Sequence, residues 1–227
     1  MFARLAVSAL IAGFGAGLVA AFLQYVFVQP ILLHSELFET GALTHFGADP
    51  TASSVPRGDF DMTRQALNVV FAALVYTGYA LILIAGMVLA EMRGHVISAQ
   101  TGLIWGFCGF LAFQLAPAFG LPPDMPGLNA ADVTPRQVWW FATVGATAAG
   151  LWLIAFGKTA LIWGLAIILL AAPHVIGAPT PDTFTGPAPP ELAAAFAART
   201  LGTTCAIWVL LGGLLGTVWN SKLSEVS

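Results

Sequence analysis

Six long apolar stretches restrict the fold of this chain more than any other feature. None of them contains Asp, Glu, Lys or Arg, and they cover residues 5–28, 67–90, 99–119, 138–157, 159–177 and 200–219. An α-helix of about 20 apolar residues is long enough to cross the hydrocarbon core of a bilayer. The chain is 58% hydrophobic and 8% charged, whereas a soluble domain carries about 25% charged residues. We therefore predict an all-α polytopic membrane protein, with the lipid bilayer as its solvent.

The prediction is six transmembrane helices in a single integral membrane domain over residues 1–227. Only Gly-Lys-Thr at 157–159 separates the fourth stretch from the fifth, so five spans with one re-entrant piece is an alternative. The uncharged N-terminal run is longer than the roughly 7–15 residues of a signal-peptide core. We interpret it as a retained first span.

The connections between the stretches alternate in length and composition. The first, third and fifth are long and rich in proline, glycine and acids, whereas 91–98 and 157–159 are short. The short connections favour both chain termini in the cytoplasm, with the long connections together on the other face. The spacings Gly13-x3-Gly17 and Gly212-x3-Gly216 are typical of helices that approach closely in lipid.

Two of the long connections repeat the same order of residues. Each begins with Ala-Pro at the end of a span, continues with glycine, proline, aspartate and a second acid, and ends with an arginine that opens the next span. The residues are Pro117, Gly120, Pro122, Asp124, Asp132 and Arg136, and then Pro173, Gly177, Pro179, Asp182, Glu191 and Arg199. The first connection follows a looser version, in which Pro30 is expected to end the helix and Arg64 opens the return.

This repeat predicts three helical hairpins that point the same way, over residues 5–90, 99–157 and 159–219. Parallel internal repeats occur in some transporters. Proline removes an amide donor, and in lipid the freed carbonyls must be satisfied by protein, water or a cation. Three converging helix exits would form a ring of carbonyls and carboxylates, here named the mouth. The alternative is that proline and glycine simply end helices at a wet interface.

Histidines and carboxylates near the first exit are candidate metal ligands. His34, Glu36 and Glu39 follow the first span, and His45 lies further out. Imidazole together with carboxylate suits divalent cobalt, nickel or zinc. If the helix continues past Pro30, Glu36 and Glu39 share one face. An ordinary solvated polar loop is the alternative.

The other two exits carry polar groups at membrane depth. His174 follows Pro173 directly, and Gln114 precedes Pro117 by three residues. An ionisable group at this depth usually faces a cavity or a partner. We predict His174 and Asp124 as metal-binding residues and Gln114, Pro117 and Pro173 as pathway-lining residues. Helix capping and interhelical hydrogen bonding are the alternatives for the side chains.

Other function classes lack support in the residues. There is no phosphate-binding loop, HExxH sequence or paired nucleophile and base, so we expect no enzyme activity and no ATP-driven step. No basic patch indicates nucleic-acid binding. Tryptophans near the span ends are interpreted as an aromatic belt.

The order of these motifs resembles the proposed cobalt transporter subunit family CbtA of bacteria. The similarity rests on FVQPILLHSELFE, FLAFQLAPAFGLPPDMPG, RQVWWFATVGATAAGLWLIAF and LLAAPHVIGAP followed by PPELAAAFAARTL. The resemblance implies a multi-pass protein of the bacterial inner membrane, cobalt uptake and a link to cobalamin synthesis. It also implies a small partner, CbtB, with one span and a histidine-rich tail.

The sequence therefore predicts an inner-membrane component of a divalent metal uptake system that passes cobalt through the acidic mouth. The alternative is a scaffold subunit that only positions a metal-binding partner. Cobalt is expected as the substrate, with no bound cofactor. Nickel accepts the same ligands.

Overall fold

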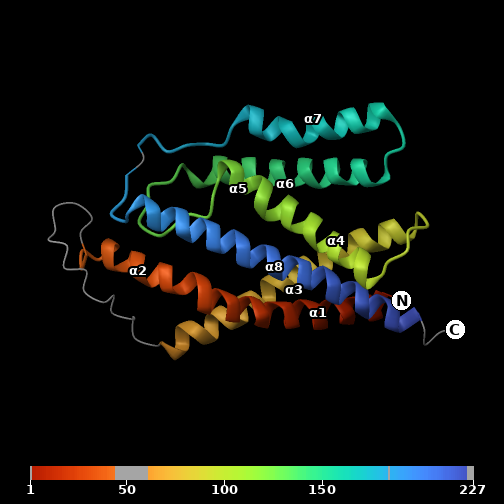
Figure 1. Cartoon of the computed structure of the whole chain (residues 1–227), viewed down its shortest axis with the longest axis horizontal. Coiled ribbons are helices and arrows are strands. Elements are labelled where there is room, and N and C mark those ends of the chain that lie inside the picture. Colours follow the sequence, from red (N-terminus) through yellow and green to blue (C-terminus); the bar gives the residue numbers. More distant parts are fainter. Residues whose placement is uncertain (1, 44–60, 184, 224–227) are drawn as a thin grey trace. The chain divides into compact units, whose positions relative to one another are not determined.

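The computed structural model describes residues 2–43, 61–183 and 185–223, and these form helices with no strands. Figure 1 shows the helices, which in chain order are α1 (Phe2–Leu23), the π-helix η1 (Gln24–Val28), α2 (Gln29–Glu39), α3 (Met62–Glu91), α4 (Ala99–Phe110), the π-helix η2 (Leu111–Leu115), α5 (Ala116–Gly120), α6 (Val133–Phe156), α7 (Ala160–Ile176) and α8 (Pro190–Leu223). The predicted all-α class is confirmed.

Five helical segments are long and apolar enough to cross a membrane. They are Leu5–Glu39, Met62–Glu91, Ala99–Gly120, Val133–Phe156 and Pro190–Trp219. The remaining helix, α7, is apolar but only 17 residues long. Five long helices and one shorter apolar helix agree with a polytopic membrane protein that has about six spans.

The expectation that Pro30 ends the first helix is wrong. The helix continues from α1 through η1 into α2 and ends at Glu39. Pro117 is likewise followed by helix as far as Gly120, and Pro173 lies inside α7. Proline in a regular α-helix collides with the carbonyl four residues earlier. A π-helix inserts an extra residue into the turn, and each of the two π-helices ends two residues before a proline, Pro30 or Pro117.

The chain divides into two compact units. The first comprises the described parts of Met1–Val26, Asp59–Phe110 and Gly202–Ser227, and the second those of Phe27–Gly58 and Leu111–Leu201. Two of the boundaries coincide with the π-helices, since one falls within η1 and another at the start of η2. The single integral domain inferred from the sequence stays a prediction.

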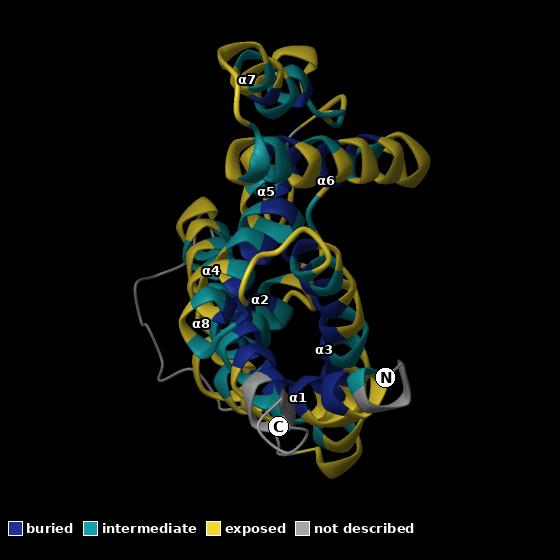
Figure 2. Cartoon of the chain, turned by 90° about the vertical axis from the view of Figure 1, so that its right-hand side faces the viewer, coloured by how far each residue is buried: buried dark blue, intermediate teal, exposed yellow. Residues whose placement is uncertain are grey.

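Glycines bring the helix backbones of the first unit into contact. α1 packs along α3, and a methyl group added at Gly13 would lie 2.5 Å from the Cα atom of Thr77. Gly212 of α8 is equally crowded, since a methyl group there would lie 2.1 Å from the carbonyl oxygen of Gly102. The close approach predicted from the glycine spacings is therefore confirmed, and Figure 2 shows buried residues, in dark blue, along α1 and α3.

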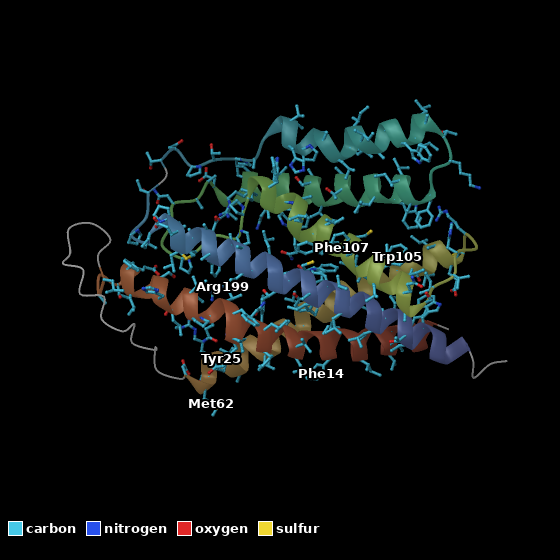
Figure 3. The ribbon with its side chains drawn as sticks, viewed as in Figure 1. Phe14, Tyr25, Met62, Trp105, Phe107 and Arg199 are labelled. Carbon is cyan, nitrogen blue, oxygen red and sulfur yellow. The ribbon has the colours of Figure 1, made fainter. Side chains whose placement is uncertain are left out.

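Apolar side chains on the outer faces of the first unit remain exposed. Phe14 of α1 is 55% exposed and Ile104 of α4 is 61% exposed, and Figure 3 shows Phe14 pointing away from α3. Because large apolar side chains in water are unfavourable, such faces are typical of helices surrounded by lipid.

Replacing Gly13 with alanine is expected to destabilise the protein, whereas replacing Gly15 is not. The new methyl group at Gly13 meets the α3 backbone, while none of the described atoms lies within 4 Å of one at Gly15. Overpacking costs about 1–3 kcal/mol, and alanine in an open helix position gains up to about 1 kcal/mol. Thermal unfolding of the two variants in detergent measures the difference. Equal midpoints would contradict the proposed backbone contact.

Candidate metal mouth in the second unit

Every candidate residue named from the sequence and described by the structure lies in the second unit. The metal candidates are His34, Glu36, Glu39, Asp124 and His174, and the pathway candidates are Gln114, Pro117 and Pro173. His45 lies outside the described residues. The first unit thus contains the glycine contacts, and the second contains the three proline exits.

The helices at the second and third exits end with the same backbone hydrogen bond. Pro117 accepts a backbone hydrogen bond from the Leu121 amide at 2.8 Å, and Pro173 accepts one from the Gly177 amide at 3.0 Å. In both cases the helix ends three residues after the proline. Gly177 has a φ of 86°, which glycine adopts without strain. Leu121, at the corresponding position of the second exit, has a φ of −127°, so the two exits share the hydrogen bond and the spacing but not the conformation of the residue after the helix.

Trp139 joins the second exit to the third. Its indole Nε1 donates a hydrogen bond to the carbonyl oxygen of Pro173 at 3.1 Å, and the side chain is buried. The same indole leaves no room at Gly120, where an added methyl group would lie 2.8 Å from the ring and 2.6 Å from the Cβ atom of Ala178. Trp139 therefore has a packing role between the two exits, in addition to its place near a span end.

His174 lies at this junction in an aromatic environment. Its ring centroid is 4.9 Å from that of Phe119 and 6.3 Å from that of Trp139, with both pairs edge to face. The Nδ1 atom is buried and has no hydrogen-bond partner among the described residues. A buried polar atom without a partner is unfavourable, so this nitrogen is a candidate to bind water or a cation.

Apolar side chains of the first exit pack against those of the other two exits. Ile31 of α2, Met125 of the second exit and Ala188 of the third form one buried cluster, against which Phe38 and Leu192 pack. All three predicted exits therefore converge within the second unit. The convergence was inferred from the sequence repeat, but this cluster of apolar residues was not.

Backbone contacts hold the two long connections together beyond this cluster. The Asn129 amide donates to the Thr185 carbonyl at 3.0 Å, and the Asn129 side chain donates to the Thr185 hydroxyl at 2.8 Å. Glu39 lies beside Gly127, where an added methyl group would be 3.3 Å from its Cγ atom. The end of α2 thus reaches the second connection.

Two arginines hold oxygen atoms of the exits. Arg136 forms a salt bridge with the carboxylate of Asp124, the acid of its own connection. Arg199 of α8, labelled in Figure 3, donates to the carbonyl oxygen of Phe27 in η1 at 3.3 Å. Each arginine of the repeat therefore contacts an oxygen atom at a helix exit.

The metal candidates do not form a closed coordination shell. Within the ranges that the structure describes, no group of three or more His, Cys, Asp or Glu side chains could hold a metal ion. Asp124 is paired with Arg136, and the His34 ring packs against Phe38 at 5.5 Å between centroids. Pro117 and Pro173 are buried, whereas His34, Glu36, Gln114 and His174 are partly buried and Glu39 is exposed. The ligand set named from the sequence stays a prediction.

Five long apolar helices and one shorter apolar helix indicate a multi-pass helical membrane protein. The chain belongs to the CbtA family, described as probable cobalt transporter subunit, whose model matches residues 2–220. The resemblance seen in the sequence is confirmed. Comparisons with curated proteins and with solved structures gave no match.

Replacing Trp139 with phenylalanine is expected to destabilise the junction of the second and third exits. The variant keeps most of the ring but removes the donor to the Pro173 carbonyl, and a net intramolecular hydrogen bond contributes about 0.5–1.5 kcal/mol. Trp163→Phe is the matched control, because Trp163 donates to the Gly157 carbonyl from an exposed position. If both variants unfolded at the wild-type temperature, the Trp139 bond would have no structural role.

Proposed function

We propose that the protein admits divalent cobalt into the membrane through the mouth formed by its three proline exits. Family membership supports cobalt as the substrate. The presence of all three exits in one unit supports the mouth as the point of entry. The observation on which this proposal mainly rests is the junction at Trp139, where the exits of α5 and α7 meet beside the unpartnered His174 nitrogen.

Incomplete coordination is compatible with transport. Co²⁺ accepts imidazole nitrogen and carboxylate oxygen, and a conducting site must bind weakly enough to release the ion. His34, Glu36, Glu39 and Asp124 would attract the ion by charge and ligation, and His174 would bind it at the junction. Gln114, Pro117 and Pro173 would line the passage. The ion is the substrate, and no cofactor is required.

The description as a subunit implies assembly with other protein. We propose that this partner is a small CbtB-like protein with one span and a histidine-rich segment in the bacterial inner membrane. Such a partner would supply the imidazole groups that this chain has in small number. The system would serve cobalamin synthesis, with both termini of this chain in the cytoplasm.

Uptake of radiolabelled cobalt by cells that lack other cobalt importers tests the proposal. Cells would carry the protein and its partner with His34→Ala, Glu36→Ala, Asp124→Asn or His174→Ala. We expect His174→Ala to reduce uptake most, by about tenfold for the loss of one ligand. His95→Ala, an exposed histidine of the first unit, is the control and should import cobalt normally.

Membrane levels of each variant would be measured in parallel. Normal uptake by every well-expressed variant would move the pathway to the partner and leave this chain as a scaffold. Absence of uptake by the wild type would count against cobalt as the substrate.

Replacing Arg136 with glutamine is expected to strengthen cobalt binding at the mouth. The change releases Asp124 from its salt bridge. A partly exposed ion pair contributes about 0.2–1 kcal/mol, so the cobalt concentration for half-maximal uptake should fall by up to about fivefold. The double variant Arg136→Gln with Asp124→Asn should lose this gain. An unchanged concentration in the single variant would show that Asp124 does not contact the ion.

A further inference from the structure

A row of residues on one face of α6 is buried. It consists of Trp139, Thr143, Thr147 and Gly150, which are spaced by four, four and three residues and therefore lie on one side of the helix. Both ends of the row contact α7. Trp139 donates to the Pro173 carbonyl, and a methyl group at Gly150 would lie 2.9 Å from the Cγ atom of Leu170.

The two threonines lie between these contacts on the same side of the helix, and α6 packs along α7 as well as against η2 and α5. Figure 1 shows the two helices side by side. The term α6–α7 seam is used here for the row of Trp139, Thr143, Thr147 and Gly150 together with the facing residues of α7. No role for its threonines follows from the family or from the sequence motifs.

The two threonine hydroxyls differ although both are deeply buried. Thr143 is 0% exposed, and its Oγ1 atom donates to the Trp139 carbonyl at 2.8 Å, which is the usual bond of a threonine within a helix. Thr147 is 3% exposed, and its Oγ1 atom has no partner among the described residues. Because an unmade hydrogen bond is costly in an apolar medium, the Thr147 hydroxyl indicates a ligand or water in the seam.

A second unpartnered atom lies at the outer end of the same seam. The buried Nδ1 of His174 is beside Trp139, near the mouth. α6 runs from the long connection at Val133 to the short connection at Phe156. With a rise of 1.5 Å per residue, Thr143 lies about 6 Å and Thr147 about 12 Å further along the axis than Trp139. The polar groups therefore follow one another at intervals of about one turn.

We propose that the α6–α7 seam is the path by which a partly hydrated divalent cation moves from the mouth into the membrane, with Thr147 as its inner binding position. This inference rests on the proposed function and extends it. His174 binds the ion at the junction, and the hydroxyl oxygens of Thr143 and Thr147 replace water molecules further in. Neutral hydroxyl oxygens are weak ligands for the ion, so they allow it to leave.

Substitution of Thr147 separates this role from a structural one. Thr147→Val has nearly the same shape and removes an unpartnered hydroxyl, so its thermal midpoint should equal or exceed that of the wild type. Its cobalt uptake should fall by about tenfold, as expected for a lost ligand, and Thr147→Ser should restore uptake. Wild-type uptake by Thr147→Val would overturn the proposal, as would a loss of uptake that follows a loss of stability.

Cysteine labelling tests the seam without measuring transport. Cys108 and Cys205 would be replaced by alanine, and single cysteines introduced as Thr147→Cys or as Ala148→Cys, the next residue, which is exposed on the outer side of α6. Figure 2 shows exposed residues, in yellow, on α6 outside the seam. A membrane-impermeant thiol reagent should label Thr147→Cys at least about tenfold faster, since a thiolate forms in water but not in lipid.

Cobalt chloride should slow this labelling, while magnesium chloride at the same concentration should not. Absence of labelling at Thr147→Cys, or labelling that cobalt does not slow, would overturn the proposed path. If the wild type imports cobalt but the seam fails these tests, the proposed function stands and the path lies elsewhere. If cobalt protects the seam but the wild type imports none, the proposed function fails.

Discussion

The structure depends on one constraint, which is that backbone and side-chain polar groups in lipid find partners within the protein. In the first unit, glycines such as Gly13 and Gly212 allow helix backbones to touch. The second unit departs from regularity at Pro30, Pro117 and Pro173. Proline has no amide hydrogen, so it cannot donate the usual helix hydrogen bond to the carbonyl four residues earlier.

Three polar contacts stabilise the region of the exits. Arg199 satisfies a carbonyl of η1, Arg136 pairs with Asp124, and Trp139 binds the Pro173 carbonyl. Other buried polar atoms have no hydrogen-bond partner among the described residues, and in the second unit these include Gln29 Oε1, Thr147 Oγ1 and His174 Nδ1. In the proposed path, an ion at such an atom would not have to displace an existing protein partner, whereas at Asp124 or Thr143 it would compete with one.

The helices and the repeat could be predicted from the sequence because both depend on local composition. Apolar length predicts the spans, and the repeated Ala-Pro exits predict matched helix ends at Pro117 and Pro173. The continuation past Pro30 could not be predicted, since the π-helices that permit it have no sequence signal that we can identify. The pairing of Asp124 with Arg136 and the place of Trp139 between two exits depend on tertiary packing. A tryptophan near a span end is equally typical of an aromatic belt.

The central claim is that the ion path lies in this chain and not in its partner. Purified protein reconstituted alone in liposomes, with a cobalt-quenched dye inside, tests it most directly. The account predicts that external cobalt quenches the dye without the partner and that His174→Ala slows the quenching, while the partner only lowers the cobalt concentration required. Quenching that occurs only when the partner is present, at any cobalt concentration, would contradict the account.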